Sequence, residues 1–468
     1  MPNTWATSGV DLHLNVTGRR IRAGLEGALR DGVRSGQLSP GTRLPSSRTL
    51  ARDLGIARNT VAEAYGQLVV EGWLTAKIGS CTQVAERVTA TDQVTSHAGA
   101  PEVSRVRYDL RAGSPDLSAF PRSGWLAAMR RVLNSAPFDA LGYSDPRGRP
   151  ELRHALTDYL SRSRGVRVNP EQIVVCSGFT QGLGLLCQVL HARGVKTLGV
   201  EAYGQPSHRA VAISSGLNFA TLSVDNLGAS MDEVGNAKAV LLTPAHQFPL
   251  GVALGPQRRT QAIEWARDTA GIVIEDDYDG EFRYDRQPVG AMQALSPEHV
   301  VYAGSASKSL VPGLRLGWLV LPGDLVDEVV TAKTLADRQG DSLSQLTLAE
   351  FITSGAYDRH VRRSRLAYRQ RRDQLVAALE RRAPQVRITG IAAGLHALLE
   401  LPIDYAEDEI VTRASHHGLA IEGLHSYNAT GQRRSGALVV GYGAPPTHAF
   451  TGSVARLCAV LNDPSPLA

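Results

Sequence analysis

The sequence lacks both long hydrophobic runs and a secretory leader. None of its apolar runs approaches the roughly 20 residues that a membrane-spanning helix needs. The segment from Met1 to Val10 has no basic stretch followed by an apolar one, which a signal peptide requires. These absences exclude a helical membrane protein, and we expect a cytoplasmic protein with no membrane partner.

Cysteine is scarce, and no pair of cysteines has CxxC spacing. The four cysteines are Cys81, Cys176, Cys187 and Cys458. This scatter excludes a disulfide framework and a zinc ribbon, and it favours small core residues. The adjacent pair His416 and His417 lacks the one-turn spacing of helical metal ligands. We therefore predict no metal site.

Positive charge is concentrated near the N-terminus. Residues 1–85 hold ten basic and six acidic side chains, and the other 383 residues have an excess of only one positive charge. With 43% hydrophobic and 20% charged residues, the chain is globular, and its 468 residues indicate more than one domain. A small basic module attached to a large, nearly neutral one indicates a polyanionic partner for the small one.

The basic module has the pattern of three helices followed by a hairpin. Apolar spacing, the possible caps Ser46 and Ser47, and glycine stops predict helices over 21–35, 47–54 and 58–71, and alternation predicts a hairpin over 73–84. This order is typical of a winged helix-turn-helix, whose recognition helix presents its first turn to base edges.

The start of the third helix carries the residues expected to read DNA. Arg58 and Asn59 can reach guanine or adenine edges in the major groove. Arg48 and Thr60 are placed to contact phosphates. The alternative is that these side chains form solvated polar faces.

Three segments resemble the hallmark of the GntR family of bacterial regulators: residues 36–51 (GQLSPGTRLPSSRTLA), 58–65 (RNTVAEAY) and 71–74 (EGWL). The resemblance covers residues 20–84 and implies a DNA-binding domain over residues 1–85. The side chains and backbone it implies at the operator are Ser46, Arg48, Arg58, Asn59, Thr60, Lys77 and Gly79. One departure is Cys81, which stands where the family's wing has a second glycine. Cysteine disfavours positive φ, so we expect a differently shaped wing tip.

The rest of the chain divides into two parts that differ in composition and periodicity, residues 86–107 and residues 108–468. The first stretch is rich in Ala, Thr, Val and Ser without periodicity, and we predict a linker. From residue 108 onward, apolar strand-like runs alternate with amphipathic helices. This alternation predicts a large α/β domain with a mostly parallel sheet and flanking helices.

Residues 305–317 (SASKSLVPGLRLG) place Lys308 between two serines, with Arg315 seven residues later. A predicted buried strand over 299–304 precedes them, so we expect the lysine on a loop at a strand end, where ligands collect in open α/β sheets. Such a lysine suits an imine to an aldehyde whose phosphate the hydroxyls and the arginine hold. A solvated serine-rich loop is the alternative. Ser307 excludes a P-loop, which needs glycine before the lysine.

Two further segments fit the same chemistry. The turn over 177–182 lies between a predicted strand and a helix, where backbone N–H groups can bind a phosphate. The run Glu275-Asp276-Asp277 ends another buried strand. One of these carboxylates can face a protonated ring nitrogen, with Tyr278 donating to the neighbouring ring oxygen.

These pieces occur in the order of the fold-type I aminotransferases, and residues 143–153 resemble that family's Tyr-x-x-Pro-x-Gly-x-x-x-Leu-Arg element. The resemblance covers about residues 108–445. It implies that Lys308 forms a Schiff base with pyridoxal 5′-phosphate, that Asp276 pairs with the pyridine nitrogen and that Tyr278 binds the phenolic oxygen. The implied phosphate contacts are Gly178, Phe179, Thr180, Ser305, Ser307 and Arg315. Tyr143 would reach the phosphate of a partner subunit, which implies a homodimer.

A GntR-type reader joined to an aminotransferase-like domain resembles the MocR/GabR subfamily of bacterial transcriptional regulators. Residues 243–249 and 275–284 resemble that subfamily in particular. The resemblance implies a regulator that senses pyridoxal phosphate, as the PdxR type does in vitamin B6 metabolism, or an amine or amino acid that forms an imine with it. Whether the dimer exchanges its DNA-binding domains head to tail stays open.

Activity as an enzyme is the competing interpretation. Working aminotransferases usually carry an arginine for the substrate carboxylate on a strand near the C-terminus, and here Val439 stands at that position. Losing a bidentate guanidinium weakens amino-acid binding, although Arg433 and Arg434 lie close by in the sequence. The pattern favours a regulator over an active aminotransferase with an accessory DNA-binding module. A third alternative is a DNA-binding protein whose large domain only dimerises.

Overall fold

The computed structural model describes residues 21–76, 81–86, 107–284, 289–431 and 436–463. The chain separates into two compact units, residues 1–103 and 104–468. The boundary falls inside the predicted linker 86–107, most of which lies outside the described residues.

The first unit consists of three helices and a two-stranded ribbon. These are α1 (Ile21–Arg34), α2 (Ser47–Leu54), α3 (Arg58–Val70), β1 (Leu74–Thr75) and β2 (Gln83–Val84). The two strands pair antiparallel. The Ser46 hydroxyl accepts the Thr49 N–H at the start of α2, and Gly55 ends that helix in the left-handed conformation. The predicted three helices and hairpin are confirmed.

The apolar positions at helical spacing form the core of this unit. Leu25, Leu29, Leu50, Val61 and Leu68 come from all three helices, and each is at most 1% exposed. Burying one such side chain contributes about 1.5–3 kcal/mol. The core therefore fixes the three helices against one another.

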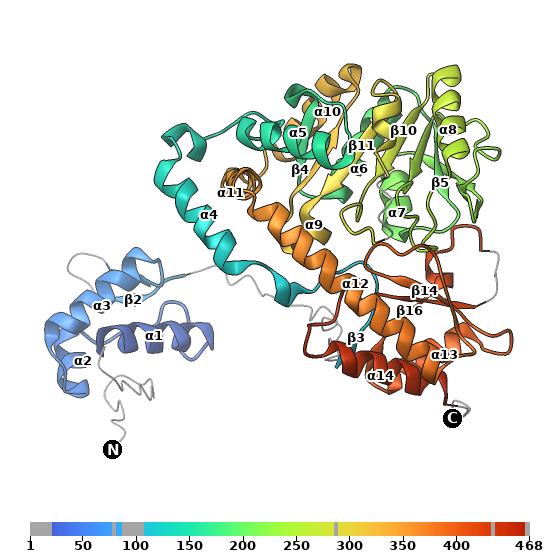
Figure 1. The fold of residues 1–468 in the computed structure, drawn as a ribbon. Coiled ribbons are helices and arrows are strands. Elements are labelled where there is room, and N and C mark those ends of the chain that lie inside the picture. The colour runs from blue at the N-terminus through green and yellow to red at the C-terminus, as the bar shows by residue number, and fades with distance from the viewer. Residues whose placement is uncertain (1–20, 77–80, 87–106, 285–288, 432–435, 464–468) are drawn as a thin grey trace. The chain divides into compact units, whose positions relative to one another are not determined.

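A seven-stranded sheet forms the centre of the second unit (Figure 1). Its order is β4-β12-β11-β10-β9-β5-β6, and only β12 runs antiparallel to its neighbours. The strands are β4 (Ile173–Cys176), β5 (Thr197–Glu201), β6 (Asn218–Leu222), β9 (Ala239–Leu242), β10 (Ile272–Asp276), β11 (Val300–Ser305) and β12 (Gly317–Val320). The predicted α/β class with a mostly parallel sheet is confirmed.

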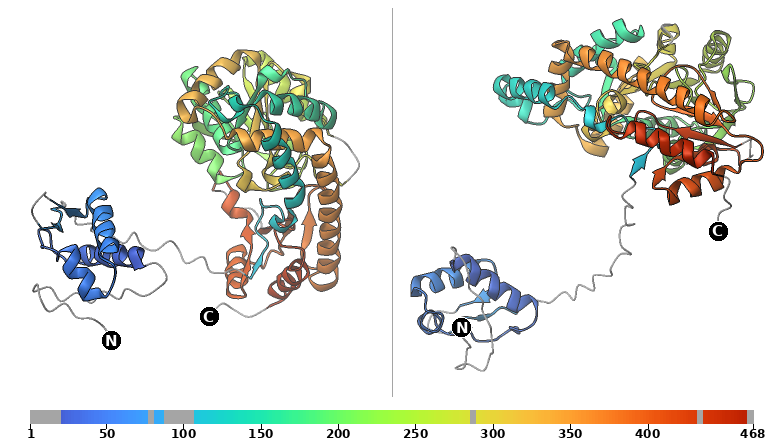
Figure 2. Two further views of the ribbon diagram at one scale, coloured as in Figure 1. Left: turned by 90° about the vertical axis from the view of Figure 1, so that its left-hand side faces the viewer. Right: turned by 60° about the horizontal axis from the view of Figure 1, so that its bottom comes forward.

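Helices cover both faces of this sheet (Figures 1 and 2). They are α5 (Pro150–Arg164), α6 (Phe179–Ala192), α7 (Pro206–Ser214), α8 (Pro256–Thr269), α10 (Val326–Asp337) and α11 (Ser342–Thr353). Helix α4 (Arg122–Ser135) packs against α11. Within β4, Ile173 packs in a core with α5 and α11, whereas its neighbour Val174 packs in a core with α6. Both faces of the strand are therefore buried, which explains the continuous apolar runs in the sequence.

A smaller antiparallel sheet follows toward the C-terminus, in the order β13-β14-β17-β16. Its strands are β13 (Arg387–Thr389), β14 (Ala397–Glu400), β16 (Glu422–Gly423) and β17 (Ala437–Val440), and it packs with α13 (Glu407–His416) and α14 (Phe450–Leu461). Two short ribbons complete the strands: β3 (Tyr108–Asp109) with β15 (Leu419–Ala420), and β7 (Val224–Asp225) with β8 (Gly228–Ala229). The β3–β15 pair joins the start of the unit to this smaller sheet.

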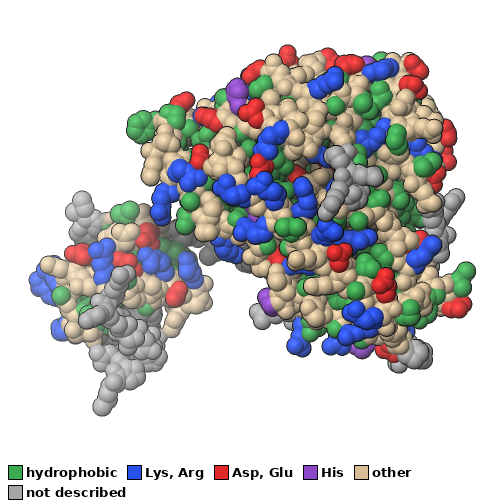
Figure 3. Space-filling model, viewed as in Figure 1, with side chains coloured by type: hydrophobic (Ala, Val, Ile, Leu, Met, Phe, Trp, Pro, Cys, Tyr) green, Lys and Arg blue, Asp and Glu red, His purple; other side chains and the backbone are tan. Residues whose placement is uncertain are grey.

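Helix α12 (Ala356–Arg382) connects the two sheets. Its first turns place Tyr357 and Val361 in the core beneath the large sheet, and its later turns place Leu375 and Leu379 in the core of the small one. Its outer side is rich in exposed arginine, and Figure 3 shows Lys and Arg side chains gathered along this face.

The first turn of α12 braces the short helix α9 (Ala306–Ser309), which carries Lys308. The Tyr357 hydroxyl donates to Ser309 Oγ at 2.7 Å, and His360 Nε2 lies 2.8 Å from the Ser309 carbonyl oxygen. The prediction of a loop around Lys308 was wrong, because the residues form one helical turn directly after β11. The lysine still stands at the carboxyl end of a strand.

The composition predicted buried cysteines and no membrane-spanning helix. Cys176, Cys187 and Cys458 are buried, as predicted for core residues, but Cys81 is exposed and the prediction was wrong there. Cys81 lies two residues before β2 and is solvent-exposed. Within the described part of the chain, every helix is too short or too polar to cross a membrane.

Candidate functional site

A cavity of about 280 Å³ lies at the carboxyl edge of the large sheet. Eight of the residues predicted to hold the cofactor line it: Phe179, Thr180, Asp276, Tyr278, Ser305, Ser307, Lys308 and Arg315. They converge because β10 and β11 are parallel neighbours, so the segments that follow them meet at one edge.

One end of the cavity is built to receive an anion. Helix α6, with 14 residues, directs its first N–H groups to this end. Gly178 precedes the helix with a φ of 91°, and a Cβ there would lie 3.2 Å from Arg315 Nη1. A Cβ at Gly317 would lie 2.9 Å from the Gly178 Cα. Two glycines therefore allow the guanidinium of Arg315 to approach the helix N-terminus.

We expect Gly178→Ala to weaken anion binding here and to destabilise the fold. The left-handed φ disfavours alanine, which predicts a loss of about 1 kcal/mol or more in the free energy of unfolding. The new methyl group also displaces Arg315. Thermal unfolding with and without inorganic phosphate measures both effects. Gly323→Ala is the matched control, because nothing lies within 4 Å of a Cβ there and its φ is not positive. Equal behaviour of the two variants would contradict this interpretation.

The three consecutive acidic residues have three different environments. Glu275 accepts the N–H groups of Met292 and Gln293 at 2.9 and 3.0 Å. Asp277 binds the Arg164 guanidinium at 2.6 and 2.9 Å and also accepts the Tyr302 hydroxyl. Asp276 is the member of the run that lines the cavity.

The charges of Asp276 and Lys308 interact with each other in the cavity. Burial raises the pKa of Asp276 well above its usual value, and Asp277 adds to the rise while the charge of Lys308 opposes it. Burial also lowers the pKa of Lys308, against the opposing effect of Asp276 and Asp279. A lowered pKa gives more of the neutral amine, which is the nucleophilic form. A buried carboxylate in this position favours a cationic ligand group.

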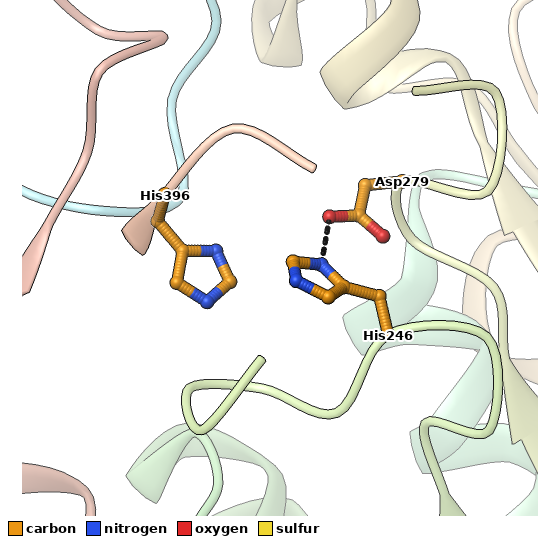
Figure 4. A group of neighbouring side chains, drawn as sticks. All are labelled: His246, Asp279 and His396. Carbon is orange, nitrogen blue, oxygen red and sulfur yellow. Dashed lines mark hydrogen bonds and ion pairs between the residues drawn. The ribbon is translucent and has the colours of Figure 1, made fainter. Parts of the chain in front are cut away.

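The sequence did not predict a buried group formed by His246, Asp279 and His396 (Figure 4). The group lies beside Tyr278. His246 and Asp279 are 3% and 2% exposed, and His246 Nδ1 lies 2.8 Å from Asp279 Oδ2. The Tyr278 hydroxyl lies 3.1 Å from the same nitrogen. The ring of His396 packs 4.9 Å from that of His246, and burial lowers the pKa of His396 to about 3. His396 is therefore neutral at physiological pH.

The same three side chains offer ligand atoms within 4.8 Å of one another, as a metal site would. These side chains already form hydrogen bonds within the protein. His246 and Asp279 bond to each other, and His396 Nε2 lies 3.2 Å from the Pro249 carbonyl oxygen. We interpret the group as a hydrogen-bonded support for Tyr278.

Three further cavity residues come from β5 and α7. Glu201 accepts the Thr243 hydroxyl, and burial raises its pKa to about 7. His208 packs edge-to-face on Phe179, and burial lowers its pKa to about 4. Arg209 donates from Nη1 to two backbone carbonyls, and burial lowers its pKa. No local motif marks these residues in the sequence, because the order of strands, which places β5 beside β9 and near β10, is what brings them to the cavity.

Val439 is the residue expected at the position of the arginine of working aminotransferases, and it is apolar. Val439 is fully buried in β17, opposite Leu398 of β14, and it packs in a hydrophobic core. It offers nothing to a carboxylate. Arg433 and Arg434 lie outside the described residues.

Tyr143 lies outside the cavity of its own chain. Its side chain is 79% exposed, and the Arg338 guanidinium stands 4.1 Å from its ring centroid. Phe138 and Leu141 nearby in the sequence are also exposed, at 93% and 63%.

The first unit leaves most of its predicted DNA-reading residues accessible. Arg58 and Asn59 are exposed in the first turn of α3, Arg48 is exposed on α2, and Thr60 is partly buried. Ser46 is exposed and caps α2. Lys77 and Gly79 lie outside the described residues.

Comparisons with known proteins agree on two domains. Residues 22–84 match the gntR family of bacterial regulatory proteins, and residues 109–409 match the class I and II aminotransferases. The chain is 34% identical over 404 residues to the HTH-type transcriptional regulator YdeL of Bacillus subtilis, covering 84% of this chain and 86% of that protein. The chain is a MocR-type regulator of the GntR family.

Two other relatives of this MocR-type chain have more informative names. It is 32% identical to the pyridoxine biosynthesis transcriptional regulator PdxR of Corynebacterium glutamicum, covering 88% of this chain and 89% of PdxR. It is also 32% identical to the probable rhizopine catabolism regulatory protein MocR of Rhizobium meliloti, covering 83% of each. Among solved structures, the kynurenine aminotransferase of Pyrococcus horikoshii matches with a TM-score of 0.69 and 24% identity, over 77% of this chain and 91% of that one. This last likeness shows the aminotransferase fold of the regulator's second unit.

The class I and II aminotransferase family depends on pyridoxal 5′-phosphate, and the donor set of the cavity fits that cofactor. The anion-binding end, where a Cβ at Gly178 would crowd Arg315, fits a phosphate. Lys308 is an amine of lowered pKa that fits the aldehyde, and Asp276 fits a protonated ring nitrogen. Bound there, the cofactor supplies imine chemistry toward amines.

Proposed function

We propose that this MocR-type regulator binds pyridoxal 5′-phosphate at Lys308 and changes its DNA binding in response. The effector is the cofactor itself, or an amine or amino acid that forms an imine with it. The observation that carries this proposal is the single cavity that brings together Lys308, Asp276, Tyr278 and the anion-binding end at Arg315. The exposed first turn of α3 in the other unit supports reading of operator DNA.

The buried Val439 supports a regulator over an enzyme. An aminotransferase holds the carboxylate of each substrate while protons move, and a bidentate arginine is the usual means. This chain has an apolar core residue there. An active aminotransferase with an accessory DNA-binding module is the second candidate, and Arg209 in the cavity is the observation that favours it.

The exposed hydrophobic surface around η2 (Phe138–Leu141) supports a homodimer. Phe138, Leu141 and Tyr143 lie within six residues and present large side chains to solvent. Apolar side chains clustered in this way mark protein–protein interaction sites. In the proposed dimer, Tyr143 reaches the phosphate bound by the partner subunit.

An absorbance titration with pyridoxal 5′-phosphate, run beside a DNA-mobility assay on the protein's own upstream region, tests the proposal. We expect an imine band to form and the mobility of the DNA complex to change over the same concentrations. A band without a change in DNA binding would show that the cofactor is permanently bound and is not the effector. Amines and amino acids would then be tested as effectors. Repeated conversion of the band by an amino acid would favour the enzyme.

A further inference from the structure

The geometry of His246 and Asp279 indicates which atom carries the proton between them. Asp279 Oδ2 is an acceptor 2.8 Å from His246 Nδ1, so this nitrogen carries the hydrogen. Both side chains are at least 97% buried, and a Cβ at Gly394 would lie 2.3 Å from Asp279 Oδ2 and 2.4 Å from His246 Cε1. The glycine therefore packs directly on the pair and holds it in place.

The same N–H also defines the orientation of the Tyr278 hydroxyl. Tyr278 Oη lies 3.1 Å from His246 Nδ1, so the N–H is shared between the carboxylate and the phenol oxygen. Because the phenol oxygen accepts there, its own hydrogen turns away from the histidine. Asp279 is also within hydrogen-bond reach of the phenol. Because Tyr278 lines the cavity with Lys308 and Asp276, its hydroxyl can donate instead to a ligand oxygen that is bound there.

We infer that His246 and Asp279 form a positioning pair that fixes the Tyr278 hydroxyl as a donor to the ring oxygen of pyridoxal 5′-phosphate, and thereby set the pH at which the Lys308 imine loses its proton. The inference rests on the proposed function, because it needs the cofactor bound at Lys308. A donor to the negatively charged ring oxygen draws charge away from the imine proton beside it. The imine therefore deprotonates at a lower pH when the pair is intact.

Other titratable groups also face the phenol, and they define the controls. They are Asp276 on β10, Glu201 on β5, Lys308 on α9 and His396 beside β14. Burial raises the pKa of Glu201 to about 7, which falls within the pH range of the titration. Glu201→Gln therefore separates the titration of Glu201 from that of the imine.

The test is a pH titration of the imine absorbance in the holoprotein. We expect His246→Leu to raise the imine pKa by about one unit, a tenfold change in proton affinity, and Asp279→Asn to raise it as well. His246→Asn places an amide N–H near the position of Nδ1 and is expected to restore most of the wild-type value. In the Tyr278→Phe background, His246→Leu is expected to have no further effect, because the two residues act through one hydrogen bond.

Three results would overturn the inference. They are an imine pKa unchanged in both His246→Leu and Asp279→Asn, a His246→Asn variant that behaves like the leucine variant, and a His246→Leu shift that persists without the Tyr278 hydroxyl. Absence of any imine band in the wild-type protein would instead overturn the proposed function. If His246→Leu does not fold, the comparison of Asp279→Asn and His246→Asn still decides the question.

Discussion

Lys308→Ala is expected to remove the imine band and to leave a protein that still binds its operator but no longer responds to pyridoxal 5′-phosphate. The imine needs a primary amine at this position, and Lys308 is the lysine that lines the cavity. The residues expected to read DNA belong to a separate compact unit. The loss of response is therefore expected to be complete, while basal DNA affinity changes little.

Two further variants sharpen this experiment. Lys308→Arg keeps a positive charge near Asp276 but cannot form the imine, so it separates charge from covalent attachment. Lys196→Ala removes an exposed lysine next to β5 and serves as the control. A DNA-mobility assay across cofactor concentrations compares all four proteins. A cofactor response that survives in both Lys308 variants would show that sensing does not use the imine.

Arg58→Ala is expected to lower operator affinity by about 1–3 kcal/mol, which is roughly 5- to 150-fold, and to relax specificity at one base pair. The residue is exposed in the first turn of α3, where a recognition helix meets base edges. Arg48→Ala is expected to weaken binding about equally on all sequences and to reduce the salt slope by about one, as loss of a phosphate contact does.

Binding to the operator and to a scrambled duplex over a salt series distinguishes these roles. Arg22→Ala is the matched control, because its guanidinium is already paired with Glu26 and Glu63. It is expected to leave operator affinity unchanged. Arg58→Ala with unaltered specificity, or a salt slope unchanged in Arg48→Ala, would contradict the roles assigned to those residues.

Much of the fold could be predicted because helices and strands each show a characteristic spacing of apolar residues, and that spacing is visible in a short stretch of sequence. The apolar spacing from Ile21 to Val33 and the run before Lys308 each specify an element on their own. The run Glu275-Asp276-Asp277 shows where this local information ends. The residue pattern alone leaves three carboxylates as candidates for the ring nitrogen, and the family resemblance selects Asp276. Only the contacts of Glu275 with Met292 and of Asp277 with distant Arg164 show that the outer two are already paired.

The parts of the site that could not be predicted depend on long-range packing. His246 and Asp279 lie on loops after different strands, and 33 positions separate them in the sequence. Arg209 stands on α7, which is brought to the cavity by the order of strands and by no local motif. The smaller sheet likewise forms from short strands that are too brief to be told from loops in the sequence.

The brace between α12 and Ser309 has a mechanical consequence. A helix of 27 residues is about 40 Å long and resists compression along its axis. Tyr357 and His360 tie one end of this rod to the residue after Lys308, and Leu375 and Leu379 bury the other end against the small sheet. The rod therefore joins the turn that carries Lys308 to the small sheet through one continuous element, so neither can shift along the helix axis independently of the other.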